Sequence, residues 1–256
     1  MFDRRLKAGR TKPPLILARD ENEVLRRAVL KPPGDQSPAE FLVEWLSFWV
    51  GRALGLDCAE IVALAVKEPF ASSASDDPAT RQLMMRSCGV VAGSVWFDGL
   101  LQDQNEKLSK SERNEAQKIL GFDVYIHNPD RRRNNPNLDR KPNGLRFALF
   151  DHEYAMSFRL PGMVLNAPPP ETGSCENIIL EHVFYGGLRR KKIPFDELES
   201  SLEKLTDEWF SELGAVAPAI WFPNGSRQQL ATILDVLRKR RDQAATWLKG
   251  VQRWLT

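Results

Sequence analysis

Cysteine is scarce in this sequence, and the few residues present form no recognisable pattern. The chain of 256 residues contains three cysteines, Cys58, Cys88 and Cys175, which lie far apart and lack Cys-x-x-Cys spacing. An odd number of widely separated cysteines does not make a disulfide framework or supply the paired thiolates of a structural zinc site. The cysteine content therefore predicts a protein of a reducing compartment.

Long apolar runs are also missing. No stretch approaches the ~18 consecutive apolar residues that cross a lipid bilayer. The first residues, MFDRRLKAGRTKPP, lack the apolar segment of a secretory signal peptide. The net charge is +2, with 27% charged and 42% hydrophobic residues, which is ordinary for a globular protein. These features predict a cytoplasmic protein without a membrane span, and the bulk charge indicates no particular partner.

The first hundred residues carry the pattern of a small sheet with one long helix. Short apolar runs bounded by turn formers predict strands at residues 13–19, 23–31, 59–66 and 89–97. In the middle of this region, Ser37 and Pro38 suit the start of a helix, and Gly55 suits its end. The polar residues 71–80 are expected to form a loop between the last two strands.

From about residue 98 the pattern becomes mostly helical. It is interrupted by the polar stretch IHNPDRRRNNPNL, residues 126–138, and by a short apolar strand after it. Residues 226–255 repeat apolar side chains at helical spacing. The sequence therefore predicts an α+β protein of two domains, a small strand-rich one at residues 1–97 and a larger helical one at residues 98–256. A cleft between two such domains is a common ligand site.

A tight turn is predicted just after the polar stretch. Asn143-Gly144 tolerates the positive φ angles of a two-residue hairpin turn. A hairpin there would lay residues 137–140 against residues 145–150. It would bring the chain before the first strand close to the chain after the second. Asn135 and Asp151 are then expected to lie side by side.

These polar side chains suit phosphoryl transfer. Mg²⁺ prefers oxygen ligands, and Asn135 and Asp151 would supply a carbonyl and a carboxylate. Asp130 could orient a hydroxyl group and accept its proton. The interval from Asp130 to Asn135 equals that between the catalytic Asp and Asn of protein kinases. The spacing alone is weak, since Asn134, Asn135 and Asn137 could simply form side-chain turns. The hairpin and the strand that ends in Asp151 make the combination more specific.

A kinase also needs a lysine that reaches the nucleotide phosphates and a glutamate that holds this lysine. Lys31 ends the second predicted strand, although a solvated strand-end lysine would look the same in sequence. Glu44 is more informative, because it follows Phe41 by three residues and precedes Phe48 by four, within the apolar stripe of the helix. A buried carboxylate is costly unless it is paired, and Lys31 is its expected partner.

Together these motifs resemble the HipA-like kinases, a bacterial family related to protein and lipid kinases. FDVYIHNPDRRRNNPNL, followed by LRFALFDHEYAMSF, resembles the family's catalytic and metal-binding segments. AVLKPP resembles its nucleotide-lysine strand, and AEFLVEWLSFWVGRALGL resembles the helix that bears the paired glutamate. The resemblance runs in order over residues 15–250. It implies a bilobal, protein-kinase-like fold, with a small β-rich N-lobe that includes one long helix and a larger helical C-lobe.

The resemblance implies roles for individual residues in the catalytic segment. Asp130 would be the catalytic base. Asn128 and Arg131 would support the catalytic loop, or Arg131 would meet a phosphate. Asn135 and Asp151 would be the metal ligands. In the N-lobe, the same resemblance implies that Lys31 contacts the nucleotide phosphates and that Glu44 is the partner of Lys31.

The implied reaction is transfer of the γ-phosphoryl group of ATP, with Mg²⁺, to a serine or threonine of a protein, including the kinase itself. By family analogy the acceptor would be a protein such as an aminoacyl-tRNA synthetase, and a lipid or small-molecule acceptor stays open. The N-terminal strands contain no G-x-G-x-x-G to cover the triphosphate. Larger toxins of the family carry an extra N-terminal segment and act with a DNA-binding antitoxin. The sequence shows no counterpart of that segment, so an antitoxin partner stays open.

A metal-dependent phosphohydrolase is the main alternative. It could use His127, Asp130, Asp151, His152 and Glu153 around Zn²⁺ or Mn²⁺. This function leaves the strand lysine and the buried helix glutamate unexplained, and the sequence has no H-E-x-x-H helix. Transfer that requires ATP and Mg²⁺ would indicate a kinase, whereas hydrolysis without ATP would indicate the alternative.

A nucleic-acid-binding module is a further alternative. Basic runs occur at residues 131–133, 189–192 and 238–241. Such a module would need these runs on one face, together with aromatic or groove-reading elements. Charge runs of this length are more often solvated helix faces. The sequence therefore weighs against nucleic acid as a partner.

Overall fold

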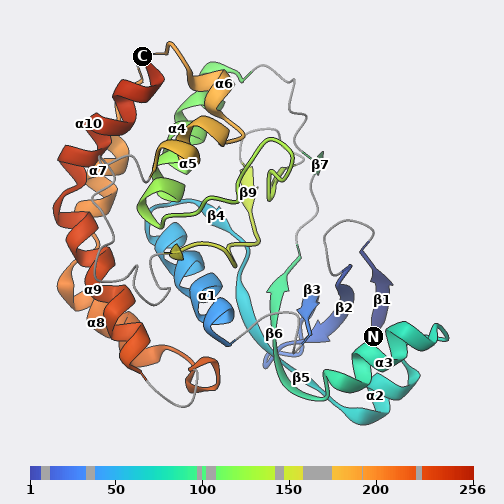
Figure 1. Ribbon diagram of the computed structural model, residues 1–256. Coiled ribbons are helices and arrows are strands. Elements are labelled where there is room, and N and C mark those ends of the chain that lie inside the picture. Colours follow the sequence, from blue (N-terminus) through green and yellow to red (C-terminus); the bar gives the residue numbers. More distant parts are fainter. Residues whose placement is uncertain are drawn as a thin grey trace. The chain divides into compact units, whose positions relative to one another are not determined.

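The computed structural model describes residues 1–6, 12–32, 38–96, 100–101, 108–141, 147–157, 175–191, 193–222 and 227–256. The fold is mixed α+β, with a strand-rich N-terminal part and a mostly helical remainder (Figure 1). Contacts divide the chain into two compact units, Met1–Phe41 with Ala59–Asp98 and Leu42–Cys58 with Gly99–Thr256. Within the described ranges, no helix is both long enough and apolar enough to cross a membrane.

The first unit is built on an antiparallel sheet. Its strands are β1 (Phe2–Arg5), β2 (Pro14–Arg19), β3 (Leu25–Lys31), β5 (Ile61–Val66) and β6 (Gly89–Val95), in the order β1-β2-β3-β6-β5. The Asp20 carboxylate accepts hydrogen bonds from the backbone N–H groups of Asn22 and Val24, which fixes the turn between β2 and β3. Lys31 ends β3, opposite Ala92 of β6. The four strands predicted here are confirmed.

Two helices separate β5 from β6, where the sequence predicted a loop. They are α2 (Glu68–Ser73) and α3 (Pro78–Arg86). Asp77 caps α3, since its carboxylate accepts a hydrogen bond of 2.8 Å from the N–H of Thr80. The predicted loop at residues 71–80 is wrong at both ends, because residues 71–73 finish α2 and residues 78–80 begin α3. Asp77 and Pro78 suit the N-cap and the first position of a helix.

The core of the first unit lies between the sheet and these two helices. Its buried members are all apolar: Ile16, Ala28, Leu30, Leu64, Val66, Ala71, Met84 and Val91. Burying a large aliphatic side chain contributes roughly 1.5–3 kcal/mol relative to leaving it exposed. This burial fixes β3, and therefore the backbone that carries Lys31.

The long predicted helix is α1, Pro38–Ala53. The helix ends as expected near Gly55, whose φ of 75° lies in the left-handed region that glycine adopts without steric cost. Its predicted cap, Ser37, lies outside the described residues. Most of α1 belongs to the second unit, and its Glu44 is fully buried. A domain boundary between residues 97 and 98 stays a prediction.

The second unit contains a small sheet that includes the predicted hairpin strands. Its strands are β4 (Asp57–Cys58), β7 (Leu100–Leu101), β8 (Leu138–Arg140) and β9 (Phe147–Leu149), in the order β4-β9-β8-β7. β8 and β9 are antiparallel, with Leu138 opposite Leu149 and Arg140 opposite Phe147. The predicted pairing of these strands is confirmed, whereas the turn at Asn143-Gly144 lies outside the described residues.

Helices make up most of the second unit (Figure 1). Besides most of α1, they are α4 (Lys110–Tyr125), α5 (Glu176–Glu181), α6 (Tyr185–Leu188), α7 (Asp196–Glu203), α8 (Asp207–Val216), α9 (Gln228–Asp242) and α10 (Ala244–Leu255), with a 3₁₀ turn at Ala219–Trp221. α4 begins with a capping box formed by Ser109 and Glu112. It contacts α5, α6, α7 and α9, and its C-terminal half is buried. α4 is therefore a fixed base for the polar stretch that follows it.

A buried arginine closes the end of α4. Arg240, on α9, is only 4% exposed. Its Nε donates to the Tyr125 carbonyl at 2.8 Å, and its Nη2 donates to the Val124 carbonyl at 2.6 Å. The last carbonyl groups of a helix have no partner within the helix, so these cationic donors satisfy them and meet the negative end of the helix dipole. The contact fixes the point at which the chain leaves α4.

Replacing Arg240 by methionine is expected to lower the free energy of unfolding by about 2–4 kcal/mol, because two buried carbonyl groups lose their donors. Urea denaturation followed by circular dichroism measures the change. Lys239→Met is the matched control: Lys239 is exposed and pairs with Asp235 on the helix surface, so its replacement should have a much smaller effect. Equal losses in the two variants would contradict this role of Arg240.

Candidate active site

The polar stretch after α4 folds back on itself before it enters β8. The backbones of Arg132 and Asn135 exchange two hydrogen bonds, of 3.0 and 3.1 Å. Next to β8, the carbonyl of Asn137 accepts a hydrogen bond of 3.1 Å from the N–H of Phe150, which follows β9. The hairpin pairing therefore continues past its strands and brings residues 127–137 against the chain after β9.

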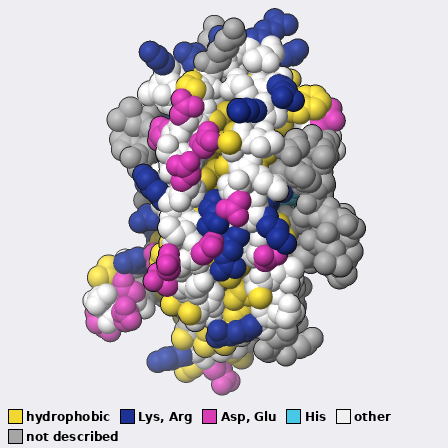
Figure 2. Space-filling view, turned by 90° about the vertical axis from the view of Figure 1, so that its left-hand side faces the viewer, with side chains coloured by type: hydrophobic (Ala, Val, Ile, Leu, Met, Phe, Trp, Pro, Cys, Tyr) yellow, Lys and Arg dark blue, Asp and Glu magenta, His cyan; other side chains and the backbone are white. Residues whose placement is uncertain are grey.

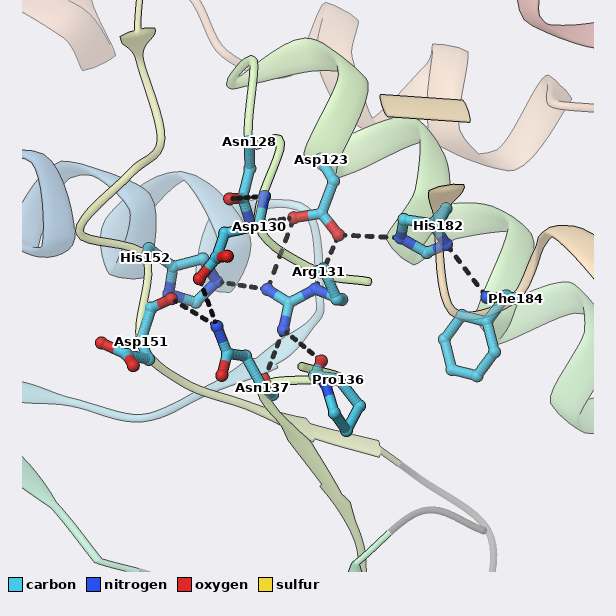
Figure 3. A network of polar contacts seen from close by, with 10 residues as sticks. All are labelled: Asp123, Asn128, Asp130, Arg131, Pro136, Asn137, Asp151, His152, His182 and Phe184. Atoms are coloured by element: carbon cyan, nitrogen blue, oxygen red, sulfur yellow. Dashed lines mark hydrogen bonds and ion pairs between the residues drawn. The ribbon is translucent and has the colours of Figure 1, made fainter. Parts of the chain in front are cut away.

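Asp130 lies just before this turn, and two amides hold its carboxylate. Oδ2 accepts hydrogen bonds from Nδ2 of Asn135 at 2.8 Å and from Nδ2 of Asn137 at 3.0 Å. The same Asn137 amide lies 3.4 Å from the backbone carbonyl oxygen of Asp151 (Figure 3). The structure thus brings Asp130 into contact with Asn135, and Asn137 links Asp130 to the backbone of Asp151. The expected placement of Asn135 beside Asp151 stays a prediction.

The surroundings of Asp130 raise the pKa of its carboxyl group. Burial is the largest cause, because it disfavours the charged form, and the negative charge of Asp151 acts in the same direction. Hydrogen bonds from Asn135 and Asn137 lower the pKa without cancelling the rise. A carboxylate with a raised pKa is a stronger base, which suits a group that takes a proton from a hydroxyl.

Three carboxylates gather beside this turn. Oxygens of Glu44, Asp151 and Glu153 all lie within 4.8 Å of one another. Glu44 is a buried residue of α1, whereas the other two follow β9. Carboxylate oxygens are the ligands that Mg²⁺ prefers, so this group is a candidate cation site. Lys31, the expected partner of Glu44, belongs to the first unit, and their pairing stays a prediction.

A buried ion pair joins α4 to the polar stretch. Asp123 of α4 and Arg131 both have fully buried side chains, and Arg131 Nε lies 2.6 Å from Asp123 Oδ2 (Figure 3). Asp123 also accepts hydrogen bonds from Asn128 Nδ2 at 2.8 Å and from His182 Nε2 at 3.0 Å. Burial raises the pKa of Asp123, but the charge of Arg131 and the hydrogen bond from His182 outweigh it and hold the pKa well below its usual range. Asp123 is therefore a buried anion.

The Arg131 guanidinium also reaches the chain on both sides of the hairpin. Nη1 donates to the backbone carbonyls of Pro136 and Asn137, and Nη2 lies 2.8 Å from Nε2 of His152. Arginine has no acceptor, so Nε2 of His152 must accept, and this histidine is neutral with its proton on Nδ1. Arg131 therefore joins α4 to the segment after β9.

His182 is fixed in the opposite tautomer. Its Nδ1 accepts a hydrogen bond of 3.2 Å from the backbone N–H of Phe184, so Nε2 carries the proton that His182 donates to Asp123. Burial lowers the pKa of His182, although Asp123 acts against this shift. The imidazole is therefore neutral, and Arg131 is the cation that neutralises Asp123.

Sequence reasoning missed three members of this network: Asp123, Asn137 and His182. A signal for Asp123 was present, because a charged residue inside the apolar run ILGFDVYI needs a buried partner. Asn137 was interpreted as a turn former. His182 lies 59 residues from Asp123 along the chain, so no local pattern connects the two. The predicted residues Asn128 and Arg131 do belong to the network, and their roles in catalysis stay predictions.

The buried anion predicts a specific acid dependence of stability. The folded state keeps Asp123 charged at pH values where the unfolded chain is protonated, so below about pH 3.9 the unfolded state binds more protons. The stability contributed by this group is complete above that pH and is lost as the pH falls. Between about pH 5 and about pH 3, the wild type should lose roughly 1 kcal/mol more than Asp123→Asn. Urea denaturation at each pH measures this difference, and parallel pH profiles would contradict it.

Known proteins provide two points of comparison. The sequence matches a family model described as HipA-like kinase over residues 2–243, whereas no curated protein matches it. Among solved structures, that of CtkA, a proinflammatory kinase of Helicobacter pylori, has a TM-score of 0.56 and 11% sequence identity, and the match covers 97% of this chain and 96% of that chain. At this identity the likeness shows the fold alone, and it confirms the predicted α+β, kinase-like fold. Because the family model spans most of the sequence, the chain belongs to the HipA-like kinase family.

Proposed function

We propose that the chain transfers the γ-phosphoryl group of ATP to a serine or threonine hydroxyl of a protein, with Mg²⁺ as the required cation. Family membership supports a kinase. The arrangement around Asp130 carries the finer proposal, because two amides hold its carboxylate next to the Asp151 backbone. A proton acceptor close to a metal-binding carboxylate is what phosphorylation of a hydroxyl requires.

Asp130 is proposed as the general base. The acceptor hydroxyl oxygen attacks the γ-phosphorus while the bond between that phosphorus and the β–γ bridging oxygen breaks. ADP leaves with the electron pair of the broken bond, and the hydroxyl proton passes to Asp130. Because Asn135 and Asn137 both donate to Oδ2, they fix the rotation of the carboxylate and leave Oδ1 to receive the proton.

The carboxylates of Glu44, Asp151 and Glu153 fit a divalent cation. Their oxygens lie within 4.8 Å of one another, and all are the hard donors that Mg²⁺ prefers. A bound Mg²⁺ would neutralise charge on the phosphates of ATP. Asp151 is proposed as a ligand. The side-chain nitrogen of Asn135 donates a hydrogen bond to Asp130, so its side-chain oxygen is the atom proposed to bind the cation, in the ligand role that the resemblance implies.

Lys31 is proposed to contact the nucleotide phosphates from the end of β3, with Glu44 as its partner. The two residues belong to different units, so this part of the proposal rests on the family resemblance. A protein acceptor such as an aminoacyl-tRNA synthetase, autophosphorylation and an antitoxin partner rest on the same analogy.

The histidines weigh against a metal-dependent phosphohydrolase. His127 Nδ1 contacts the hydroxyl of Ser157, and His152 Nε2 is occupied by Arg131. In the part of the chain that the structure describes, the carboxylate group that could hold a metal includes no histidine. A hydrolase that binds Zn²⁺ through these histidines therefore has less support than a kinase.

The basic run of α9 weighs against a nucleic-acid-binding module. Arg238 and Arg241 lie within ion-pair distance of Asp207, and Lys239 pairs with Asp235. Figure 2 shows the face on which α9 lies, where basic and acidic side chains are interspersed. A nucleic-acid backbone would have to compete with these carboxylates for the cations.

The proposal is tested by incubating the protein with γ-labelled ATP and Mg²⁺, alone and with cell lysate, followed by peptide mapping. Label is expected on serine or threonine of the protein itself or of a lysate protein. Asp130→Ala should lower kcat by about 10²–10⁴-fold, because the base is lost. Asp235→Ala, which removes an exposed aspartate of α9, is the control and should keep full activity. Label confined to a lipid or small molecule, hydrolysis that needs no ATP, or an unimpaired Asp130→Ala variant would contradict the proposal.

Asp151→Ala is expected to abolish the Mg²⁺-dependent part of ATP binding, because it removes a carboxylate from the candidate cation site. Calorimetric titration with ATP in the presence of Mg²⁺, and again in EDTA, measures that part. Glu203→Ala removes an exposed carboxylate from α7 and should bind ATP as the wild type does. The same Mg²⁺ dependence in Asp151→Ala and in the wild type would exclude Asp151 as a ligand.

A further inference from the structure

We infer that Asp123 and His182 form a positioning pair, which holds Asn128 and Arg131 in the geometry that phosphoryl transfer needs. The inference rests on the proposed kinase function and extends it to two residues outside the base and the cation site. Its starting point is the Asp123 carboxylate, where the catalytic loop, residues 127–137, meets α4 and the chain after α5 (Figure 3).

Both oxygens of Asp123 are engaged. Oδ1 accepts hydrogen bonds from Asn128 Nδ2 at 2.8 Å and from Arg131 Nη2 at 3.4 Å. Oδ2 accepts from Arg131 Nε at 2.6 Å and from His182 Nε2 at 3.0 Å. A carboxylate has about four lone-pair sites, so these donors fill it. The side chain is fully buried, and water therefore does not compete for it.

Asn128 and Arg131, which Asp123 binds, contact the chain at Asp130 and next to Asp151. Asn128 Oδ1 accepts a hydrogen bond of 3.2 Å from the N–H of Asp130. Arg131 contacts the histidine that follows Asp151 in the chain. The proposed base and the proposed metal ligand are thus each adjacent to a contact that Asp123 controls.

His182 holds the Asp123 carboxylate on the side that faces away from the catalytic loop. Because Phe184 donates to Nδ1 of His182, the Nε2 proton is turned toward Asp123. A backbone hydrogen bond joins the same two segments, since the N–H of Val183, next to His182, donates to the Arg131 carbonyl at 3.1 Å. A neutral donor holds the carboxylate here without competing with the charge of Arg131.

Substitution of His182 tests the pair without removing the buried charge. His182→Leu removes the donor, whereas His182→Gln can place its amide nitrogen near the position of Nε2 and keep the hydrogen bond. In the phosphotransfer assay, His182→Leu should lower kcat by about 10- to 100-fold and change the KM for ATP less than about threefold, since misplacing the base slows the chemical step more than it weakens binding. His182→Gln should recover most of the lost rate.

Tyr125→Phe is the matched control for a purely structural effect. Tyr125 follows Asp123 on the same helix, but its hydroxyl donates to the carbonyl of Leu237 on α9 at 2.9 Å. Loss of this buried hydrogen bond should lower stability in urea denaturation and leave kcat unchanged.

The results of these assays distinguish failure of the positioning pair from failure of the proposed kinase function. If the wild type transfers phosphate and His182→Leu keeps its kcat, the pair is refuted and the kinase function stands. The same conclusion follows if His182→Gln is as slow as His182→Leu, or if Tyr125→Phe loses as much rate at equal stability. Absence of transfer by the wild type with Mg²⁺ and ATP would refute the proposed function, and the pair with it.

Discussion

The buried pair of Asp123 and Arg131 is the interaction on which the geometry of the site depends. Removing two charges from water costs several kcal/mol per ion unless close contact and further hydrogen bonds compensate. Here the charges meet at 2.6 Å, and Asn128, His182 and backbone carbonyls complete their hydrogen bonding. A well-packed apolar pair could stabilise the fold equally well. Such an apolar pair could not orient a polar loop. The ion pair does so, because its directed hydrogen bonds fix the positions of Asn128, the Asn137 carbonyl and His152.

These hydrogen bonds matter because the chain around the candidate site adopts strained backbone conformations. His127, Asn137 and Asp151 have φ angles of 53°, 46° and 58°. The left-handed region costs a residue other than glycine about 1–2 kcal/mol, and Asn and Asp tolerate it best. Such conformations persist only where the surroundings determine them. Arg131 binds the Asn137 carbonyl and the histidine after Asp151, so the ion pair supplies that determination at two of the three positions.

The sequence predicted the parts of the site that local rules control. A hairpin follows from turn formers between two short apolar runs, and the pairing of its strands brings Asn137, which binds Asp130, close to the backbone of Asp151. The same rules failed at residues 78–80, which were predicted as part of a loop but begin α3. They also could not find His182, because a contact over 59 residues is decided by how α5 packs against α4. A charge within an apolar run indicates that a partner exists, but only tertiary packing selects the partner.

Glu44 shows how such an incomplete signal can still be informative. Its position in the apolar stripe of α1 called for a positive charge, and Lys31 was the candidate that the sequence offered. The structure places oxygens of Asp151 and Glu153 within 4.8 Å of a Glu44 oxygen. Three carboxylates this close repel one another, so the local demand for positive charge is greater than a single buried glutamate would create. A divalent cation at the centre of the group would offset this repulsion from all three sides, whereas a lysine would do so from one side. Glu44 thereby joins α1 to the segment of Asp151 within the candidate cation site.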